Sequence, residues 1–452
     1  MVKRIAVGEP ADLSASDALE AMAEGALSAQ ALTEACLARI DTADPQVQAW
    51  TQVDHRRAVF EARAQDRRRA DGLPLPALHG VPVGLKDIID AKGLATENGT
   101  PLDAGNRPSE DATIVRRLRD AGAVIVGKTV TAELAYFHPG VTRNPHDPER
   151  TPGGSSSGAA AAVAAGMVPF AVGTQTNGSV IRPASFCGVV GYKPSYGTVP
   201  RTGILQGAQS LDQVGFFARS VEDVALAGEL MGPDGVDEDC HLNAGPLRET
   251  VLSEPPLTPD LAMVETPFWD RAAADTRDGF AELLDVLGDH GTAAGLPEVF
   301  GRGAGWLATV MAAEMGRNLG HYADRDPDQV SATFKALIEQ GRSIHAVDYL
   351  AARDMQAVMR EALDPLFERF DAILTPSAPS EAPRDLDTTG DPIFCTLWTF
   401  CGLPAVTLPL LAGENGLPIG VQLVGPYGQD AKLLRTARWL ARLCAANVEE
   451  SG

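Results

Sequence analysis

The chain has 452 residues, of which 44% are hydrophobic and 22% are charged, and its net charge is −22. This composition is typical of a globular protein, and no apolar run reaches the ~18 residues that a membrane-spanning helix needs. The acidic balance disfavours direct binding to nucleic acid, because phosphate contacts require clustered Lys and Arg side chains.

The amino end and the cysteines favour a cytoplasmic protein. The first residues, MVKRIAVGEPADLSAS, contain two basic residues but no apolar stretch after them, so no secretory signal is visible. Six cysteines are scattered without a C-x-x-C pair or a Cys/His cluster, which argues against a zinc site or a disulfide framework. We expect reduced thiols, no bound metal and no membrane contact. The short basic cluster at Arg67 to Arg69 is interpreted as a solvated helix face.

Apolar patterning predicts an α/β fold. Residues 16–40 place apolar side chains at helical spacing, and from Leu78 onward short apolar runs alternate with helical stretches such as 113–122. This alternation is typical of βα units around a sheet that is buried on both faces. We predict a single large α/β domain with a central mixed, mostly parallel β-sheet that helices cover on both faces.

Composition divides the predicted domain into four segments. Residues 1–70 are expected to form an N-terminal helical segment that packs on the core, and residues 71–231 to form the core itself. An acidic, Pro- and Gly-rich stretch at 232–259 marks a boundary. Residues 232–370 are therefore predicted to be a mainly helical excursion that covers the substrate, and strand-like runs return residues 371–452 to the core sheet.

Two motifs match functional patterns only formally. GAVIVGKT, residues 122–129, satisfies the phosphate-loop pattern, but its apolar middle is typical of a strand and not of a flexible loop. GSSSG, residues 154–158, satisfies the nucleophile-elbow pattern, but the preceding RNPHDPERTPG cannot form the buried strand that such an elbow leaves. Neither surrounding sequence supports the function that its motif suggests.

A serine in a later turn is a better candidate nucleophile. The segment GTQTNGSVIRPAS, residues 173–185, follows the apolar run PFAVG and places Asn177 and Gly178 directly before Ser179. Asn and Gly tolerate positive φ, so the N–H groups of this turn can converge to hold an oxyanion. A Gly-Ser turn alone is more often only a turn, so catalysis also requires a base.

Lys86, in HGVPVGLKDIID, is the candidate base, because none of the eight histidines lies within the Gly- and Ser-rich region. Burial disfavours the ammonium form, so a desolvated lysine can be neutral near pH 7 and accept a proton. The alternative is a strand-end lysine that extends to solvent or pairs with Asp87.

Taken together, the long motifs resemble the amidase signature family. They are GVPVGLKD, TPGGSSSGAAAAVAAGMVP, GTQTNGSVIRPASFCGVVGYKPS, GLPAVTLPL and GLPIGVQLVG, and the resemblance runs from about residue 13 to residue 443. Malonamidase-like members look nearest, because they are similar in having Gln at the position of Gln175 and the run Ser-Val-Ile-Arg after it.

The resemblance implies a Ser-Ser-Lys triad that needs no cofactor. Matched motif by motif, Ser179 is the nucleophile, Ser155 is the bridging serine after a cis peptide bond, and Lys86 is the base. The implied oxyanion hole consists of the backbone N–H groups of the turn, which are those of Thr176, Asn177, Gly178 and Ser179.

Three residues are candidates for substrate contact: Gly154, Arg182 and Met311. By resemblance, Arg182 holds a substrate carboxylate, and the alternative is a structural salt bridge. Met311 lies in the helical stretch 305–316, whose periodicity fits either a pocket wall or core packing. Many family members have Gly where this chain has Asn177, which leaves the preferred acyl group open.

Three functions follow as hypotheses. The first is a stand-alone amidase that cleaves C–N bonds of small amides through an acyl-enzyme, extending to anilides, carbamates (urethanase activity) or aryl esters. The second is the catalytic subunit of a tRNA-dependent amidotransferase. The third is a P-loop nucleotide-binding protein, which tight ATP binding dependent on Lys128 would support. The expected ligand is a small amide or carbamate, and a homodimer is left open as the assembly.

Overall fold

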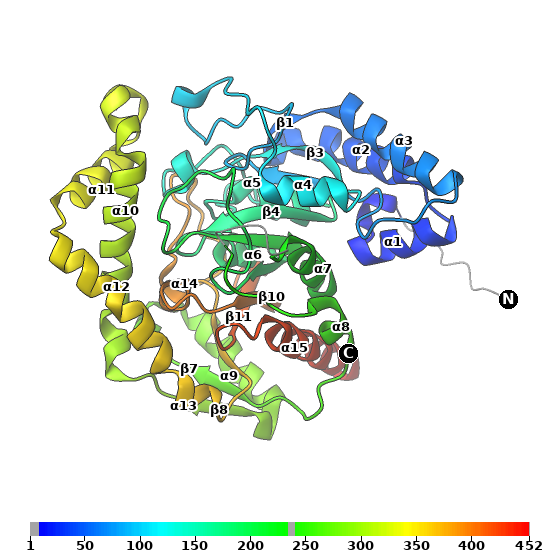
Figure 1. Cartoon of the computed structure of the whole chain (residues 1–452). Helices are drawn as coiled ribbons and strands as arrows, with labels where there is room; N and C mark the ends of the chain where they lie inside the picture. The colour runs from blue at the N-terminus through cyan, green and yellow to red at the C-terminus, as the bar shows by residue number, and fades with distance from the viewer. Residues whose placement is uncertain (1–8, 234–239, 452) are drawn as a thin grey trace.

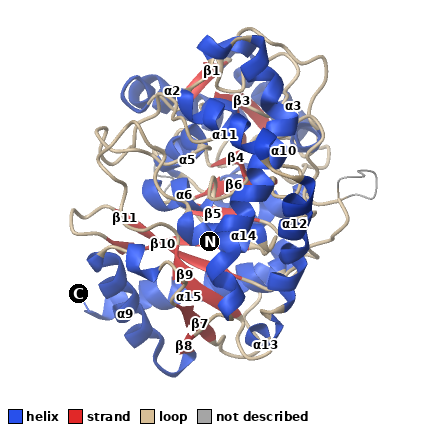
Figure 2. Ribbon diagram, turned by 90° about the vertical axis from the view of Figure 1, so that its left-hand side faces the viewer, coloured by secondary structure: helices blue, strands red, loops and turns tan. Residues whose placement is uncertain are grey.

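One mixed β-sheet of eleven strands organises the computed structural model, which describes residues 9–233 and 240–451. In spatial order the strands are β1 (Trp50–Val53), β3 (Val124–Thr129), β2 (Pro82–Lys86), β4 (Phe170–Gln175), β6 (Gln213–Ala218), β5 (Val190–Lys193), β10 (Ala405–Ala412), β11 (Pro418–Val424), β9 (Ala372–Pro376), β7 (Leu261–Val264) and β8 (Gly291–Ala294). Figure 2 shows this sheet in red, from β1 at the top to β8 at the bottom.

The sheet corrects one detail of the predicted fold. Four of the described strand pairs are parallel and six are antiparallel, so the expectation of a mostly parallel sheet is wrong. Strands buried on both faces are apolar throughout whatever their direction, so the sequence pattern did not reveal orientation. The single large α/β domain itself is confirmed.

The helices complete the α/β domain. Their bounds are α1 (Ala15–Glu24), α2 (Ala29–Val47), α3 (His55–Ala70), α4 (Thr113–Asp120), α5 (Ser157–Ala164), α6 (Ile181–Cys187), α7 (Val221–Met231), α8 (Leu247–Leu252), α9 (Ala274–Leu287), α10 (Gly303–Arg325), α11 (Ala332–Ser343), α12 (Ala346–Glu361), α13 (Asp364–Phe367), α14 (Ile393–Phe400) and α15 (Asp430–Ser451).

Adjacent residues of β5 show that helices cover both faces of the sheet. A Cβ built at Gly191 would touch Ala184 of α6, whereas the ring of Tyr192 lies against Gly228 of α7. Successive strand residues point to opposite faces, so α6 and α7 lie on opposite sides of the sheet. Figure 1 shows α10, α11 and α12 as a separate layer on the left, away from α1, α2 and α3.

The parallel strands bring two candidate residues to one edge of the sheet. β2 lies between β3 and β4 and runs parallel to both. Parallel neighbours need crossover connections, which α4 supplies between β2 and β3 and α5 between β3 and β4. Lys86 ends β2, and Ser179 follows the end of β4, so both lie at the carboxyl edge of these strands.

The predicted segments can now be placed. Residues 232–370, expected to be mainly helical, contain α8 to α13 and also supply β7 and β8 to the sheet. The formal phosphate-loop motif ends in the buried strand β3, as its apolar residues predicted.

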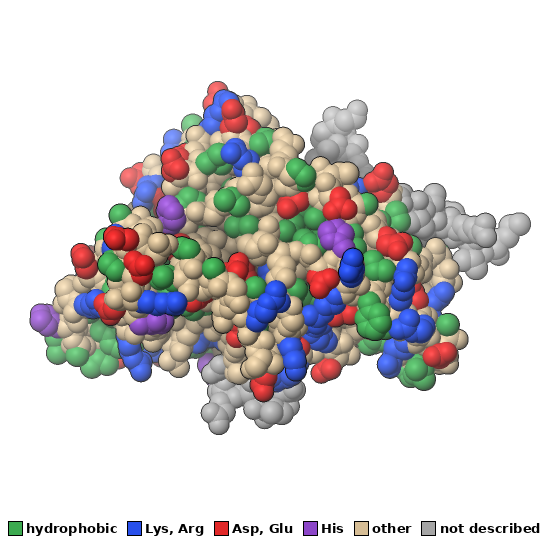
Figure 3. All heavy atoms as spheres, turned by 90° about the horizontal axis from the view of Figure 1, so that it is seen from above, with side chains coloured by type: hydrophobic (Ala, Val, Ile, Leu, Met, Phe, Trp, Pro, Cys, Tyr) green, Lys and Arg blue, Asp and Glu red, His purple; other side chains and the backbone are tan. Residues whose placement is uncertain are grey.

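Arg67 and Arg68 are exposed on α3, and Figure 3 shows acidic and basic side chains interspersed on the face seen there. None of the helices within residues 9–233 and 240–451 combines the length and the apolar character of a membrane-spanning segment.

Candidate active site

Lys86 is a fully buried lysine at the end of β2. Every residue of that strand is buried, and the Lys86 side chain has an exposed fraction of 0%. Its Nζ lies 2.7 Å from Ser155 Oγ and 2.9 Å from Thr174 Oγ1. Burial lowers the pKa of Lys86 to about 7, although the charge of Asp212 acts in the opposite direction. The amine is therefore poised between its neutral and charged forms at neutral pH.

Asp87 does not neutralise Lys86, which was the alternative that the sequence left open. The Asp87 carboxylate lies 3.0 Å from Lys128 Nζ, and both side chains are buried. In the described part of the chain, no carboxylate forms an ion pair with Lys86. Lys128 also donates to Thr96 Oγ1 and to the carbonyl of Ala95, so it serves a structural pair instead of a phosphate site.

The loop before α5 presents Ser155 to Lys86. The Gly154–Ser155 peptide bond is cis, as the family resemblance implies. Ser156 Oγ donates to the carbonyl of Thr174 at 3.0 Å, and Ser157 Oγ donates to the carbonyl of Gly153 at 2.8 Å. Ser156 therefore holds the loop against β4, Ser157 closes the loop on itself, and the Ser155 hydroxyl is left to Lys86.

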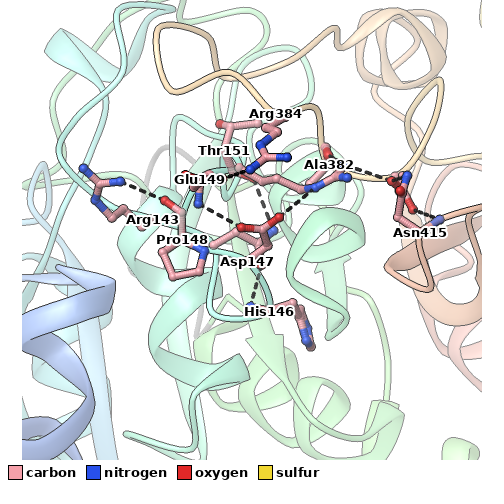
Figure 4. A network of polar contacts seen from close by, with 12 residues as sticks. Arg143, His146, Asp147, Pro148, Glu149, Thr151, Ala382, Arg384 and Asn415 are labelled. Atoms are coloured by element: carbon pink, nitrogen blue, oxygen red, sulfur yellow. Dashed lines mark hydrogen bonds and ion pairs between the residues drawn. The ribbon is translucent and has the colours of Figure 1, made fainter.

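A polar network fastens the start of this loop to the C-terminal part of the chain. Arg150 lies 3.1 Å from the carboxylate of Asp147 and 2.8 Å from that of Glu381, and it donates to the carbonyl of Ala382 at 2.6 Å. Asn415 donates to Glu381 from its side chain at 2.6 Å. Figure 4 shows Asp147 and Ala382 in the middle of this network and Asn415 at its right-hand side.

The turn that carries Ser179 lies between β4 and α6. Gln175 is buried, and its side-chain oxygen accepts hydrogen bonds from the N–H groups of Val180 at 2.8 Å and Ile181 at 3.0 Å. The backbone hydrogen bonds described outside regular helices and strands include none donated by residues 176–179. The N–H groups of Thr176, Asn177, Gly178 and Ser179 stay the predicted donors of an oxyanion hole.

The two candidate serines are not hydrogen-bonded to each other. Ser155 Oγ is hydrogen-bonded to Lys86. Residue Ser179 is 8% exposed, and the described residues supply no hydrogen-bond partner for its Oγ. Catalytic hydrogen bonds are often long in unliganded enzymes and tighten once substrate is bound.

Arg182 is buried without an acidic partner among the described residues. One terminal nitrogen donates to the carbonyl of Gly154 at 2.6 Å and to Thr389 Oγ1 at 3.1 Å. Its Nε and other terminal nitrogen have no hydrogen-bond partner in the described ranges. Burial lowers the pKa of Arg182 to about 10, so the side chain stays charged at neutral pH. The structural salt bridge that the sequence left open is not formed with any described residue.

A small pocket lies against the Ser179 turn and Arg182. Its lining combines the turn, Arg182 and apolar side chains: Ala135, Tyr136, Phe137, Thr176, Asn177, Gly178, Ser179, Arg182, Met311 and Met315. Met311 therefore contributes to a wall of this pocket, although it is also part of a hydrophobic cluster. Gly154 is not among the lining residues and acts here through its carbonyl, which accepts from Arg182.

Several residues at this site carried no distinctive signal in the sequence. Thr396 and Thr399 of α14 donate to the side-chain oxygen and the carbonyl of Asn177, at 2.8 and 2.5 Å. The side chain of Asn177 is thus tied to α14. Tyr136 and Phe137 follow two non-glycine residues with positive φ, Leu134 and Ala135. Isolated Thr and aromatic residues are too common for their spacing to indicate a pocket.

Comparisons with known proteins agree with this geometry. Residues 31–434 match the family described as Amidase. A glutamyl-tRNA(Gln) amidotransferase subunit from Anaeromyxobacter sp. (strain K) is 38% identical over 476 residues, which cover 93% of this chain and 94% of that protein. AtzE, a 1-carboxybiuret hydrolase subunit from Pseudomonas sp. (strain ADP), is 34% identical over 444 residues, which cover 93% and 96%.

A solved structure extends the comparison to three dimensions. Native peptide amidase from Stenotrophomonas maltophilia superimposes with a TM-score of 0.85 at 28% identity, covering 96% of this chain and 97% of that one. These relatives do not bear on the expected likeness to malonamidase-like proteins, which stays a prediction.

Proposed function

We propose a Ser-Ser-Lys triad for this chain, which belongs to the amidase family and is an amide-hydrolysing enzyme. The three members of the triad are Lys86, Ser155 and Ser179. The observation that carries this proposal is the buried amine of Lys86, which lies 2.7 Å from Ser155 Oγ and has no carboxylate partner among the described residues. A lysine in this state can serve as a base at neutral pH.

The proposed reaction begins with proton transfer along the two hydroxyls. Neutral Lys86 accepts the proton of Ser155, Ser155 accepts that of Ser179, and Ser179 Oγ attacks the carbonyl carbon. The N–H groups of residues 176–179 stabilise the oxyanion. The proton then returns through Ser155 to the leaving nitrogen as the C–N bond breaks, and water hydrolyses the acyl-enzyme by the same route.

The triad is tested with a fluorophosphonate probe and intact-mass analysis of the full chain. We expect one adduct, which peptide mapping locates on Ser179, and we expect Lys86→Ala to lose it while the fold is retained. Labelling at any other serine, or unchanged labelling of Lys86→Ala, contradicts the proposed triad. Circular dichroism of both proteins serves as the folding control.

Two kinds of enzyme could use this triad: a stand-alone hydrolase, and a subunit of a tRNA-dependent amidotransferase. The comparisons favour the amidotransferase subunit. A stand-alone hydrolase of amides, anilides, carbamates or aryl esters is supported by the apolar wall that Tyr136, Phe137 and Met311 give the pocket. An ammonia-releasing subunit of a tRNA-dependent amidotransferase is supported by the 38% identity to an amidotransferase subunit over 93% of the chain. The 34% identity to AtzE, itself part of a hydrolase assembly by its name, favours a multi-chain setting as well.

A further inference from the structure

Asp212 is a buried carboxylate directly behind the turn that carries Ser179. It precedes β6, which pairs antiparallel with β4 so that Gln175 lies opposite Gln213. This register places Asp212 beside Thr176, whose Oγ1 donates to Asp212 Oδ1 at 2.7 Å. Thr176 is the first of the four residues whose N–H groups are the predicted donors of an oxyanion hole, so Asp212 holds the beginning of the oxyanion turn.

The second carboxylate oxygen of Asp212 is fixed independently of the turn. Oδ2 accepts hydrogen bonds from the N–H groups of Gly207 and Ala208, both at 2.9 Å, and lies 3.2 Å from a guanidinium nitrogen of Arg201. Burial raises the pKa of Asp212, while Arg201 and these hydrogen bonds favour the ionised form. A carboxylate with this many donors is a rigid anchor.

Asp212 lies close to the hydrogen-bond partner of Lys86. Thr174 Oγ1 accepts from Lys86, Thr176 Oγ1 two residues later donates to Asp212, and Thr174, Thr176 and Asp212 line one cavity. The charge of Asp212 therefore also acts on Lys86. It is the charged neighbour that favours the ammonium form of Lys86 against burial, since the adjacent Asp87 is paired with Lys128. Among the described residues, the titratable groups that interact with Asp212 include Arg201, Lys86 and Tyr196. During catalysis Lys86 gains a proton, so a fixed negative charge near it stabilises the protonated intermediate.

We propose that Asp212 is a positioning residue for this active site, which orients the oxyanion turn through Thr176 and stabilises the protonated form of Lys86 by its charge. The proposal rests on the proposed roles of Lys86 and Ser179. One carboxylate thus has two effects, the hydrogen bond to Thr176 and the charge that acts on Lys86. A substitution can remove either effect and keep the other.

The experiment measures the rate at which a fluorophosphonate probe labels Ser179 in the full chain between pH 5 and pH 9. In the wild type the rate should rise with pH around a midpoint of about 7, because only neutral Lys86 is a base. Asp212→Asn removes the charge, while its amide oxygen can still accept from Gly207 and Ala208 and its NH₂ can bond to Thr176. Thr176→Val instead keeps the charge and removes the hydroxyl.

Opposite outcomes are expected for these two variants. Asp212→Asn should move the midpoint to lower pH by roughly half a unit or more, because protonated Lys86 loses its favourable charge. Thr176→Val should lower the plateau rate on the order of tenfold and leave the midpoint in place. Asp289→Asn, which removes the same charge just before β8 at the far end of the sheet, should change neither value.

An unchanged midpoint in folded Asp212→Asn overturns the role of its charge, and an unchanged plateau in Thr176→Val overturns the positioning role. If Asp212→Asn does not fold, Thr176→Val decides the positioning role alone. Loss of labelling in the wild type is a different result, because it refutes the proposed triad and not the role of Asp212.

Discussion

At the scale of single residues, burial gives Lys86 and Arg182 different tasks. Both side chains are almost fully buried, but burial lowers the pKa of Lys86 to about 7 and that of Arg182 only to about 10. Lys86 can therefore exchange a proton at neutral pH, whereas Arg182 stays a cation. Arg182 lines the Ser179 pocket, and two of its nitrogens have no hydrogen-bond partner among the described residues. A permanent cation with these free donors is suited to binding a substrate carboxylate or carbonyl.

Replacement of Arg182 tests this assignment. Arg182→Lys keeps a positive charge but loses the planar fork, so we expect kcat/KM for a small dicarboxylic acid monoamide to fall about 10- to 100-fold. The uncharged primary amide of the same length should lose much less. Steady-state kinetics on this substrate pair provide the measurement. Equal losses for both substrates would instead show that Arg182 acts only by supporting Gly154.

At the scale of elements, the small residues of α5 allow close packing between the helix and two backbone segments. A Cβ at Gly158 would collide with the carbonyl oxygen of Ala49 and lie 2.5 Å from the backbone nitrogen of Val130. Every residue of the helix except Ala164 is buried. Because α5 begins two residues after Ser155, its depth in the core sets the position of that serine.

Gly158→Ala is expected to destabilise the protein by about 3 kcal/mol, because the obstructing atoms are backbone and α5 must shift. Labelling of Ser179 should fall as well, since the shift moves Ser155. Chemical denaturation gives the free energy of unfolding. Gly305→Ala is the matched control, because Gly305 is exposed in α10 with nothing within 4 Å, and it should be neutral or stabilising by up to about 1 kcal/mol. Equal stability of both variants contradicts this account.

At the scale of the whole molecule, the site is assembled from both halves of the chain. The N-terminal half supplies Lys86, Ser155 and Ser179, whereas Thr389 and Thr396 reach Arg182 and Asn177 across 207 and 219 residues of sequence. The network around Arg150 and Glu381 adds a further link between the halves. Segments from both halves of the chain therefore have to pack together to form the site.

An assay of the full-length chain distinguishes a stand-alone hydrolase from an amidotransferase subunit. If the chain is part of an amidotransferase, its glutaminase activity should be low in isolation and rise severalfold when partner chains from its own host and ATP are added. Ammonia release is the measurement. Full turnover of anilides or carbamates by the isolated chain, without stimulation by partners, contradicts the amidotransferase role and supports a stand-alone hydrolase.

The sequence determined by itself those features that depend on local pattern. Alternating apolar runs predicted the α/β class, and the long motifs around Lys86, Ser155 and Ser179 predicted which residues would lie near one another. Lys86 and Ser155 do meet, at 2.7 Å. A strand-like middle in the formal phosphate-loop motif also correctly predicted β3.

Only the tertiary structure decided features that depend on pairing between distant segments. It made the sheet mainly antiparallel, left Arg182 without an acid among the described residues, and placed Asp212 near Lys86 while Asp87 pairs with Lys128. The physical reason is that the electrostatic environment of a buried charge depends on neighbours from every strand and helix around it. Periodicity along the chain records only whether a residue is buried, and not which residues surround it.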